Sequence, residues 1–343
     1  MLSRSIRSKL LPAALAGATL LATLTGAQAQ DNAVESITVV VPTASAISNF
    51  PLWVAKGEGY FADEGLDVTV QVVDGSAASI QVLTSGQAEI GHAGPSLVLQ
   101  AQERGVDVVA FYNLNPNSVF GVIVEGDSGY TDVAQLEGKI IGVGTADGAE
   151  VPFFNGIMRS IGLVEGEDYE LLVVGDGGLA AVGFTRGDID AYVASTSDAS
   201  IMRARGIDVS NITPAAFRTQ FGNGFVTLRE TLDSNPELIE RFGRALVRAA
   251  IFAQDPANED AVLAHAAVGN PQEGEDREFA SALFETILER GTPLDLSNGW
   301  GYFPREGWEF WQETELANGG LSAPLDNLDA AFTTDFVQAW NAQ

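Results

Sequence analysis

The spacing of hydrophobic positions along the chain switches repeatedly between a pattern typical of strands and a pattern typical of helices. Residues 37–41 form a continuous β-branched run, as expected for a strand buried on both faces. Amphipathic stretches with helical spacing follow, and the alternation predicts an open, mostly parallel sheet covered by helices. The strands expected here are 37–41, 66–73, 88–92 and 106–112, and the helices are 50–59, 76–85 and 95–103.

The same rhythm starts again at residue 118 and predicts a second α/β lobe of ordinary domain size. Its expected strands are 118–124, 140–143, 169–174 and 189–193, and its helices are 133–136 after a Thr131 cap, 150–161, 179–184 and 199–205. Beyond residue 228 only helices are expected, at 236–253, 259–267, 277–288, 305–317 and 328–340. We expect two lobes side by side that share crossing segments, with a hinge near residues 116–120 and 222–225.

The N-terminus has the layout of a secretory signal peptide. Arg4, Arg7 and Lys9 precede an apolar run at residues 10–24, and small residues surround Gln28 at the expected cleavage site. The run is too short to span about 30 Å of hydrocarbon with any margin. The pattern predicts export, with a mature chain that starts at Gln30.

Charge and cysteine content narrow the function classes. The formal net charge is −28, and the first 29 residues hold three of the bases and no acid. An excess of negative charge of this size repels nucleic acid and anionic lipid, so neither is expected as a partner. Cys is absent, which excludes disulfides, thiolate metal sites and cysteine nucleophiles. The acidity itself is typical of a solvated surface, with a cation-binding surface as the alternative.

Four segments resemble one protein family. Residues 51–68 read PLWVAKGEGYFADEGLDV, and the matches that follow in order are LTSGQAEIG at 83–91, LEGKIIGV at 136–143 and GDIDA at 187–191. Together they resemble the ABC-importer solute-binding proteins for nitrate, sulfonates, taurine and thiamine-precursor pyrimidines. The resemblance covers residues 37–228, and the helical C-terminal third matches only in general layout.

The resemblance implies a type II periplasmic-binding-protein fold with two lobes, each an open, mostly parallel sheet flanked by helices. We expect residues 1–29 to be the signal peptide, 30–117 and 233–343 to form the first lobe, and 118–232 to form the second. The implied protein is a periplasmic monomer that closes around a small molecule and delivers it to an ABC permease and its ATPase. No cofactor and no metal are expected.

In open sheets of this kind, ligands lie beyond the carboxyl ends of the strands, where loops meet helix N-termini. Free N–H groups there attract polar or anionic ligand atoms. Ser48 and Asn49 can also serve as ordinary helix caps, and His92 can equally be a structural histidine. The candidate ligand-binding residues of the first lobe are Ser48, Asn49, Phe50, Ser76, His92, Gly94, Pro95, Ser96, Tyr112 and Asn113.

The second lobe adds three strand-end loops. Gly142, Gly144 and Gly148 have the wrong spacing for a dinucleotide fingerprint, and Asp147 and Glu150 can simply favour the positive end of a helix. The family resemblance implies that Glu150 and Asp198 hold a heterocyclic ring. The candidates are Asp147, Gly148, Glu150, Asp176, Ser195, Thr196 and Asp198.

Basic residues are absent from the first-lobe loops and from 145–150 and 195–198, and Arg186 and Arg218 are the nearest by sequence. This favours a thiamine-precursor-like pyrimidine or another aromatic or heterocyclic solute. A sulfonate, taurine or nitrate anion is the alternative, because helix N-termini bind anions without a basic side chain.

An enzyme acting on a small heterocycle is the rival from another class. The chain has no Gly-x-Ser-x-Gly elbow and no His-Glu-x-x-His cluster. The pyrimidine-forming members of the family depend on cysteine-rich motifs that are absent here. We therefore expect a binding protein and no enzyme. A sensor domain of the same fold would need an attached membrane or signalling segment.

Overall fold

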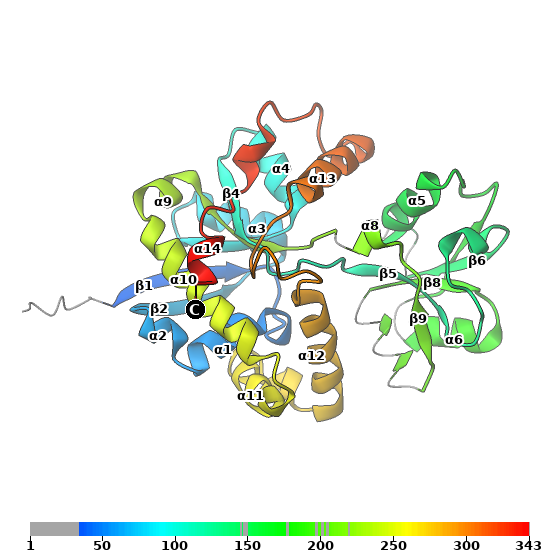
Figure 1. Cartoon of the computed structure of the whole chain (residues 1–343), viewed down its shortest axis with the longest axis horizontal. Coiled ribbons are helices and arrows are strands. Elements are labelled where there is room, and N and C mark those ends of the chain that lie inside the picture. The colour runs from blue at the N-terminus through cyan, green and yellow to red at the C-terminus, as the bar shows by residue number, and fades with distance from the viewer. Residues whose placement is uncertain are drawn as a thin grey trace, which may run out of the picture. The chain divides into compact units, whose positions relative to one another are not determined.

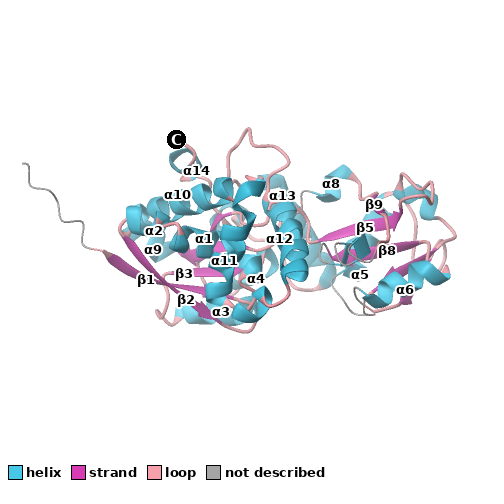
Figure 2. Ribbon diagram, turned by 90° about the horizontal axis from the view of Figure 1, so that it is seen from below, coloured by secondary structure: helices cyan, strands magenta, loops and turns pink. Residues whose placement is uncertain are grey.

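The computed structural model describes residues 34–342 except 145, 147–149, 176–177, 196–197, 200–201, 204–205 and 219. Val34–Gln343 group as one compact unit, in which two five-stranded sheets are built (Figures 1 and 2). The signal peptide expected at residues 1–29 lies outside the described residues. So does part of the helix expected at 199–205.

The first sheet has the order β2-β1-β3-β10-β4. Its strands are β1 (Glu35–Val41), β2 (Leu66–Val72), β3 (Ile90–Ala93), β4 (Val108–Tyr112) and β10 (Gly224–Leu228). β1 pairs in parallel with β2 and β3, whereas β10 is antiparallel to both β3 and β4. The other four strands run in one direction, so the expectation of a mostly parallel sheet is confirmed, with β10 as the one antiparallel strand between β3 and β4. The expected division places β10 with the second lobe, although its hydrogen bonds join it to the first sheet.

Alternating side chains of β1 pack into two different cores, because successive strand residues point to opposite faces. Val39 and Val41 belong to a core with helices α1, α10, α11 and α12, and Val40 belongs to a core with α3, α4 and α13. Figure 1 shows α4 and α13 on one side of this sheet and α1, α11 and α12 on the other. The helices are α1 (Phe50–Gly57), α2 (Tyr60–Asp63), α3 (Gly75–Thr84), α4 (Pro95–Glu103), α9 (Arg229–Ser234), α10 (Pro236–Phe252), α11 (Glu259–Gly269), α12 (Arg277–Gly291), α13 (Arg305–Asn318) and α14 (Val337–Trp340).

The second sheet has the order β7-β6-β8-β5-β9, and β5 is antiparallel to both of its neighbours. Val122 and Val124 face a core with α5, and Ile123 faces a core with α6. The elements are β5 (Phe120–Glu125), β6 (Ile140–Val143), β7 (Glu170–Val173), β8 (Ala191–Ser195), β9 (Val209–Asn211), α5 (Glu150–Ser160), α6 (Gly178–Arg186) and α8 (Ala215–Arg218).

Short 3-10 turns complete the chain and correct two expectations. They are η1 (Ile47–Asn49), η2 (Val133–Leu136), η3 (Pro256–Asn258), η4 (Pro271–Gly274) and η5 (Leu328–Ala331). The cap of η2 is Asp132 in a capping box with Gln135, and not Thr131. The single helix expected at 328–340 is instead η5 and α14 with non-helical residues between them.

Two crossing segments, residues 113–119 and 212–223, connect the sheets. They run beside each other, since Gly222 N donates to Asn115 O at 2.8 Å and Ser118 N donates to Arg218 O at 2.8 Å. Asn115 Nδ2 also donates to Asn223 O at 3.0 Å. Any movement of one segment therefore carries the other with it.

Candidate functional site: a cavity bordered by both sheets

A cavity of about 610 Å³ lies where the two crossing segments meet the ends of both sheets. Its volume is within the usual range for a small-molecule site. The wall contains segments from α3, α4 and α13 of the first lobe and from β5, α5 and α8 of the second. Its lining residues include Ser76, Gly94, Pro95, Ser96, Phe120, Phe153, Phe217, Gln220, Asn223, Phe310 and Trp311.

A row of aromatic rings crosses this cavity wall from one lobe to the other. The ring centroids of Phe120 and Phe153 are 5.8 Å apart, and Phe217 is 6.4 Å from Phe153 at 89°. Phe217 then meets Phe310 of α13 at 6.2 Å and 84°, and Phe310 meets Trp311 at 6.1 Å. These spacings and edge-to-face angles are the ones aromatic pairs prefer. The row offers a planar solute several ring faces.

Two helix N-termini contribute hydrogen-bonding groups to the wall. α3 and α4 begin at the cavity, and neither has a side-chain hydrogen bond on its cap. Gly94 N donates to Ser76 Oγ at 3.1 Å, which ties the two N-termini together. The remaining free N–H groups of a helix N-terminus favour an acceptor atom. A Cβ on Gly94 would lie 2.9 Å from Asn223 Oδ1, so glycine is what lets the crossing segment come this close.

Four of the predicted site residues line this cavity together: Ser76, Gly94, Pro95 and Ser96. Ser48, Phe50, Tyr112 and Asn113 instead line a separate cavity of about 10 Å³, on the face of the first sheet that α12 covers. That volume holds about one water molecule. The structure thus divides the first-lobe candidates between two places.

His92 and Asn49 are buried on the α12 side, at 4 % and 1 % exposure. Both ring nitrogens of His92, Oδ1 of Asn49 and Oδ1 of Asn113 have no hydrogen-bond partner among the described residues. Burial, and secondarily the positive charge of Arg290, lower the pKa of His92 to about 3. The ring is therefore neutral at pH 7, with one donor and one acceptor nitrogen.

The second-lobe candidates are placed only in part. Glu150 is the first residue of α5, and Asp198 is buried, with Tyr192 Oη 3.5 Å from its Oδ2. Neither lines the 610 Å³ cavity. Asp147, Gly148, Asp176 and Thr196 lie outside the described residues, as does the side chain of Ser195, the last residue of β8. Their role as ligand contacts stays a prediction.

Residues that local sequence patterns did not single out supply most of the wall. Phe310 and Trp311 come from α13, far along the chain from the other lining residues, and Trp311 Nε1 donates to Phe221 O of the crossing segment at 3.0 Å. The signal available in the sequence was the density of aromatic residues at 308–311.

Two further tests of function apply to the described part of the chain. In it, no group of three or more His, Cys, Asp or Glu residues is arranged to hold a metal ion. Across the same residues, no helix is both long enough and apolar enough to cross a membrane.

The chain is similar in sequence to proteins of one known family. A family model described as NMT1/THI5 like matches residues 47–259, more than half of the chain. The riboflavin-binding protein RibY of Chloroflexus aurantiacus is 25 % identical over 308 residues, which cover 88 % of this chain and 86 % of RibY. The 4-amino-5-hydroxymethyl-2-methylpyrimidine phosphate synthase of Aspergillus parasiticus is 26 % identical over 217 residues, which cover 59 % of this chain and 62 % of the synthase.

Among solved structures, the fold is similar to that of a periplasmic sulfonate-binding protein, SsuA from Methylobacillus flagellatus KT, described as part of a sulfonate ABC transporter. The TM-score is 0.63 at 16 % identity, and the match covers 90 % of this chain and 94 % of SsuA. At this identity the likeness shows the fold alone, which is the two-lobed α/β fold expected from the sequence.

Proposed function

Because the chain belongs to the NMT1/THI5-like family, we propose that it is the periplasmic solute-binding component of an ABC importer. It captures a small aromatic or heterocyclic molecule between its two lobes. The observation that carries the proposal is the aromatic row from β5 to α13 around a 610 Å³ cavity. The relative named for riboflavin and the one named for a pyrimidine both support a planar heterocycle as the solute.

Capture follows from the position of the cavity. Phe153 and Phe217 belong to the second lobe, and Phe310 and Trp311 to the first, so a solute held by all four favours the closed arrangement by its differential affinity. Residues 113–119 and 212–223 act as the hinge. The closed, loaded protein then meets a permease that works with an ATPase.

The chemistry of the cavity wall supports binding over catalysis. Its polar side chains are hydroxyls and amides with one arginine and one glutamate, Arg159 and Glu315. His92 lies outside this wall with both nitrogens unbonded within the described chain, so no described histidine activates a hydroxyl there. The second candidate, an enzyme acting on a pyrimidine, rests on the relative named as a synthase.

The test is a thermal-shift panel of purified protein with riboflavin, aminopyrimidines, alkanesulfonates and nitrate. A solute that binds only the folded chain raises its stability by RT ln(1 + [L]/Kd), about 2.7 kcal/mol at a concentration of one hundred times Kd. We expect the planar heterocycles to raise the melting temperature and the Phe217→Ala variant to weaken them about 5- to 150-fold, the loss of one stacking face. No shift with any member of the panel contradicts the proposal, and turnover of a pyrimidine favours the enzyme.

A further inference from the structure

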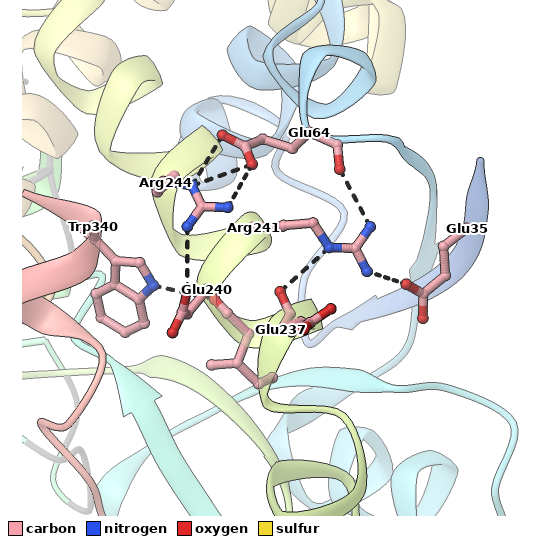
Figure 3. A network of polar contacts seen from close by, with 8 residues as sticks. Glu35, Glu64, Glu237, Glu240, Arg241, Arg244 and Trp340 are labelled. Carbon is pink, nitrogen blue, oxygen red and sulfur yellow. Dashed lines mark hydrogen bonds and ion pairs between the residues drawn. The ribbon is translucent and has the colours of Figure 1, made fainter. Parts of the chain in front are cut away.

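Gln220 is a buried polar side chain without a hydrogen bond. Even partly buried polar groups of this protein are paired elsewhere, as Figure 3 shows for Arg244 with Glu64 and Glu240. Gln220 is 7 % exposed, and its side-chain amide has no hydrogen bond to any described residue. Buried polar groups in folded proteins are nearly always hydrogen-bonded. The amide of Gln220 is therefore available to a bound molecule.

This amide borders the aromatic row. Gln220 lines the 610 Å³ cavity and a neighbouring cavity of about 340 Å³, and Phe310 of the aromatic row lines the same two cavities. Phe217, another ring of the row, comes three residues before Gln220 in the chain and also lines the first cavity. A planar solute stacked on these rings would bring one of its edges to the amide.

The other two buried polar side chains of the described wall, those of Ser118 and Glu315, already have partners. Ser118 Oγ accepts a hydrogen bond from Phe120 N at 3.2 Å. Glu315 Oε2 accepts one from Gln100 Nε2 at 2.9 Å, which ties α13 to α4. Of these three buried side chains, Gln220 is the one that keeps both an acceptor oxygen and a donor NH2 group unused.

The backbone on both sides of Gln220 is held in place. The carbonyl of Arg218 and the N–H of Gly222 are each bonded to the other crossing segment at 2.8 Å. Between them, Phe221 is fully buried, with its ring centroid 5.0 Å from that of Phe303. A side chain on a fixed backbone loses less freedom when it binds a solute, so its hydrogen bonds contribute more to affinity.

We propose that Gln220 recognises one edge of the captured heterocycle, and that this edge carries an N–H donor next to an acceptor atom. A carboxamide presents an acceptor oxygen and an NH2 donor side by side, and it pairs with such an edge through two hydrogen bonds. The inference rests on the proposed function and deepens it. The aromatic row holds the faces of the ring, whereas Gln220 distinguishes rings of similar shape by their polar edge. The solute class is an amino- or oxo-substituted nitrogen heterocycle.

The experiment compares two probes of nearly the same shape, 4-aminopyrimidine and 4-methylpyrimidine. The methyl group replaces the amino group and removes the N–H donor beside the ring nitrogen. The melting temperature of the purified protein, measured over a series of millimolar concentrations, gives the affinity for each probe. We expect the wild type to bind the amino compound about tenfold more tightly, the effect of one or two hydrogen bonds. Gln220→Leu keeps the size of the side chain without the amide and should bind both probes equally.

The melting temperature without any probe separates a binding role from a structural one. Gln220→Leu removes an amide that has no partner in the described chain, so the free variant should melt no lower than the wild type. Gln102→Leu is the matched control, because Gln102 Nε2 donates to Val108 O at 2.7 Å and to Ala330 O at 3.2 Å. Gln102 does not line the aromatic cavity. Its replacement should lower the melting temperature and leave the preference between the probes as in the wild type.

Two results with Gln220→Leu overturn the inference. One is a variant that keeps the wild-type preference for the amino compound, and the other is a free variant whose melting temperature falls as far as that of Gln102→Leu. A wild type that binds heterocycles without preferring the amino compound also overturns the inference, and it leaves the proposed function standing. A wild type that responds to no heterocycle contradicts the proposed function itself, and the inference falls with it.

Discussion

His92 is buried, and its ring nitrogens have no hydrogen-bond partner among the described residues, so it makes the stability of the protein depend on pH in a definite direction. In the unfolded chain the His92 pKa is near its ordinary value of 6.5, whereas in the folded chain it is about 3, because burial and the nearby Arg290 disfavour the charged ring. Between these two values the unfolded state binds a proton that the folded state does not. The free energy of unfolding therefore falls as the pH decreases from about 6.5 to about 3.

The magnitude follows from the two pKa values. One pKa unit corresponds to about 1.4 kcal/mol, so the whole window is worth about 5 kcal/mol. Between about pH 7.5 and pH 5, the contribution of His92 is about 2 kcal/mol. Carboxylates also titrate near the lower end of this range, so the wild type alone does not isolate the effect.

The assay is urea unfolding at both pH values for the wild type, His92→Gln and His92→Phe. Neither replacement titrates, so both variants should lose about 2 kcal/mol less than the wild type on acidification. The two replacements differ in packing and will differ in absolute stability, but their pH-dependent difference from the wild type should agree. Equal acid sensitivity of all three proteins would show that His92 is hydrated or partnered in solution, and would refute the reasoning.

Two further predictions concern the core and the hinge. Trp340→Ala should lower the free energy of unfolding by about 3–5 kcal/mol, because Trp340 is fully buried and its Nε1 donates to Ile239 O at 3.1 Å. Urea unfolding measures this loss, and a loss below about 1 kcal/mol would contradict the prediction. Gly222→Pro removes the N–H that donates to Asn115 O. It should weaken the solute-induced decrease in radius of gyration that small-angle scattering measures. An unchanged decrease would show that the hinge does not lie at Gly222.

The scaffold was readable from the sequence because its signals are local. The burial of Val39, Val40 and Val41 in β1 agrees with the expectation of a strand buried on both faces, since that pattern depends on side chains a few positions apart. The same reasoning failed for β10, whose antiparallel partners β3 and β4 lie more than 110 residues earlier in the chain. Strand order across such a separation is set by tertiary packing, and no periodicity within the strand records it.

The candidate site was predictable only where it is made from strand-end loops. Ser76, Gly94, Pro95 and Ser96 could be chosen because they follow strands and open helices. Phe310 and Trp311 could not, because aromatic residues in a helix are more often part of the core. Their place in the wall depends on how α13 packs against the crossing segment, where Trp311 Nε1 donates to Phe221 O.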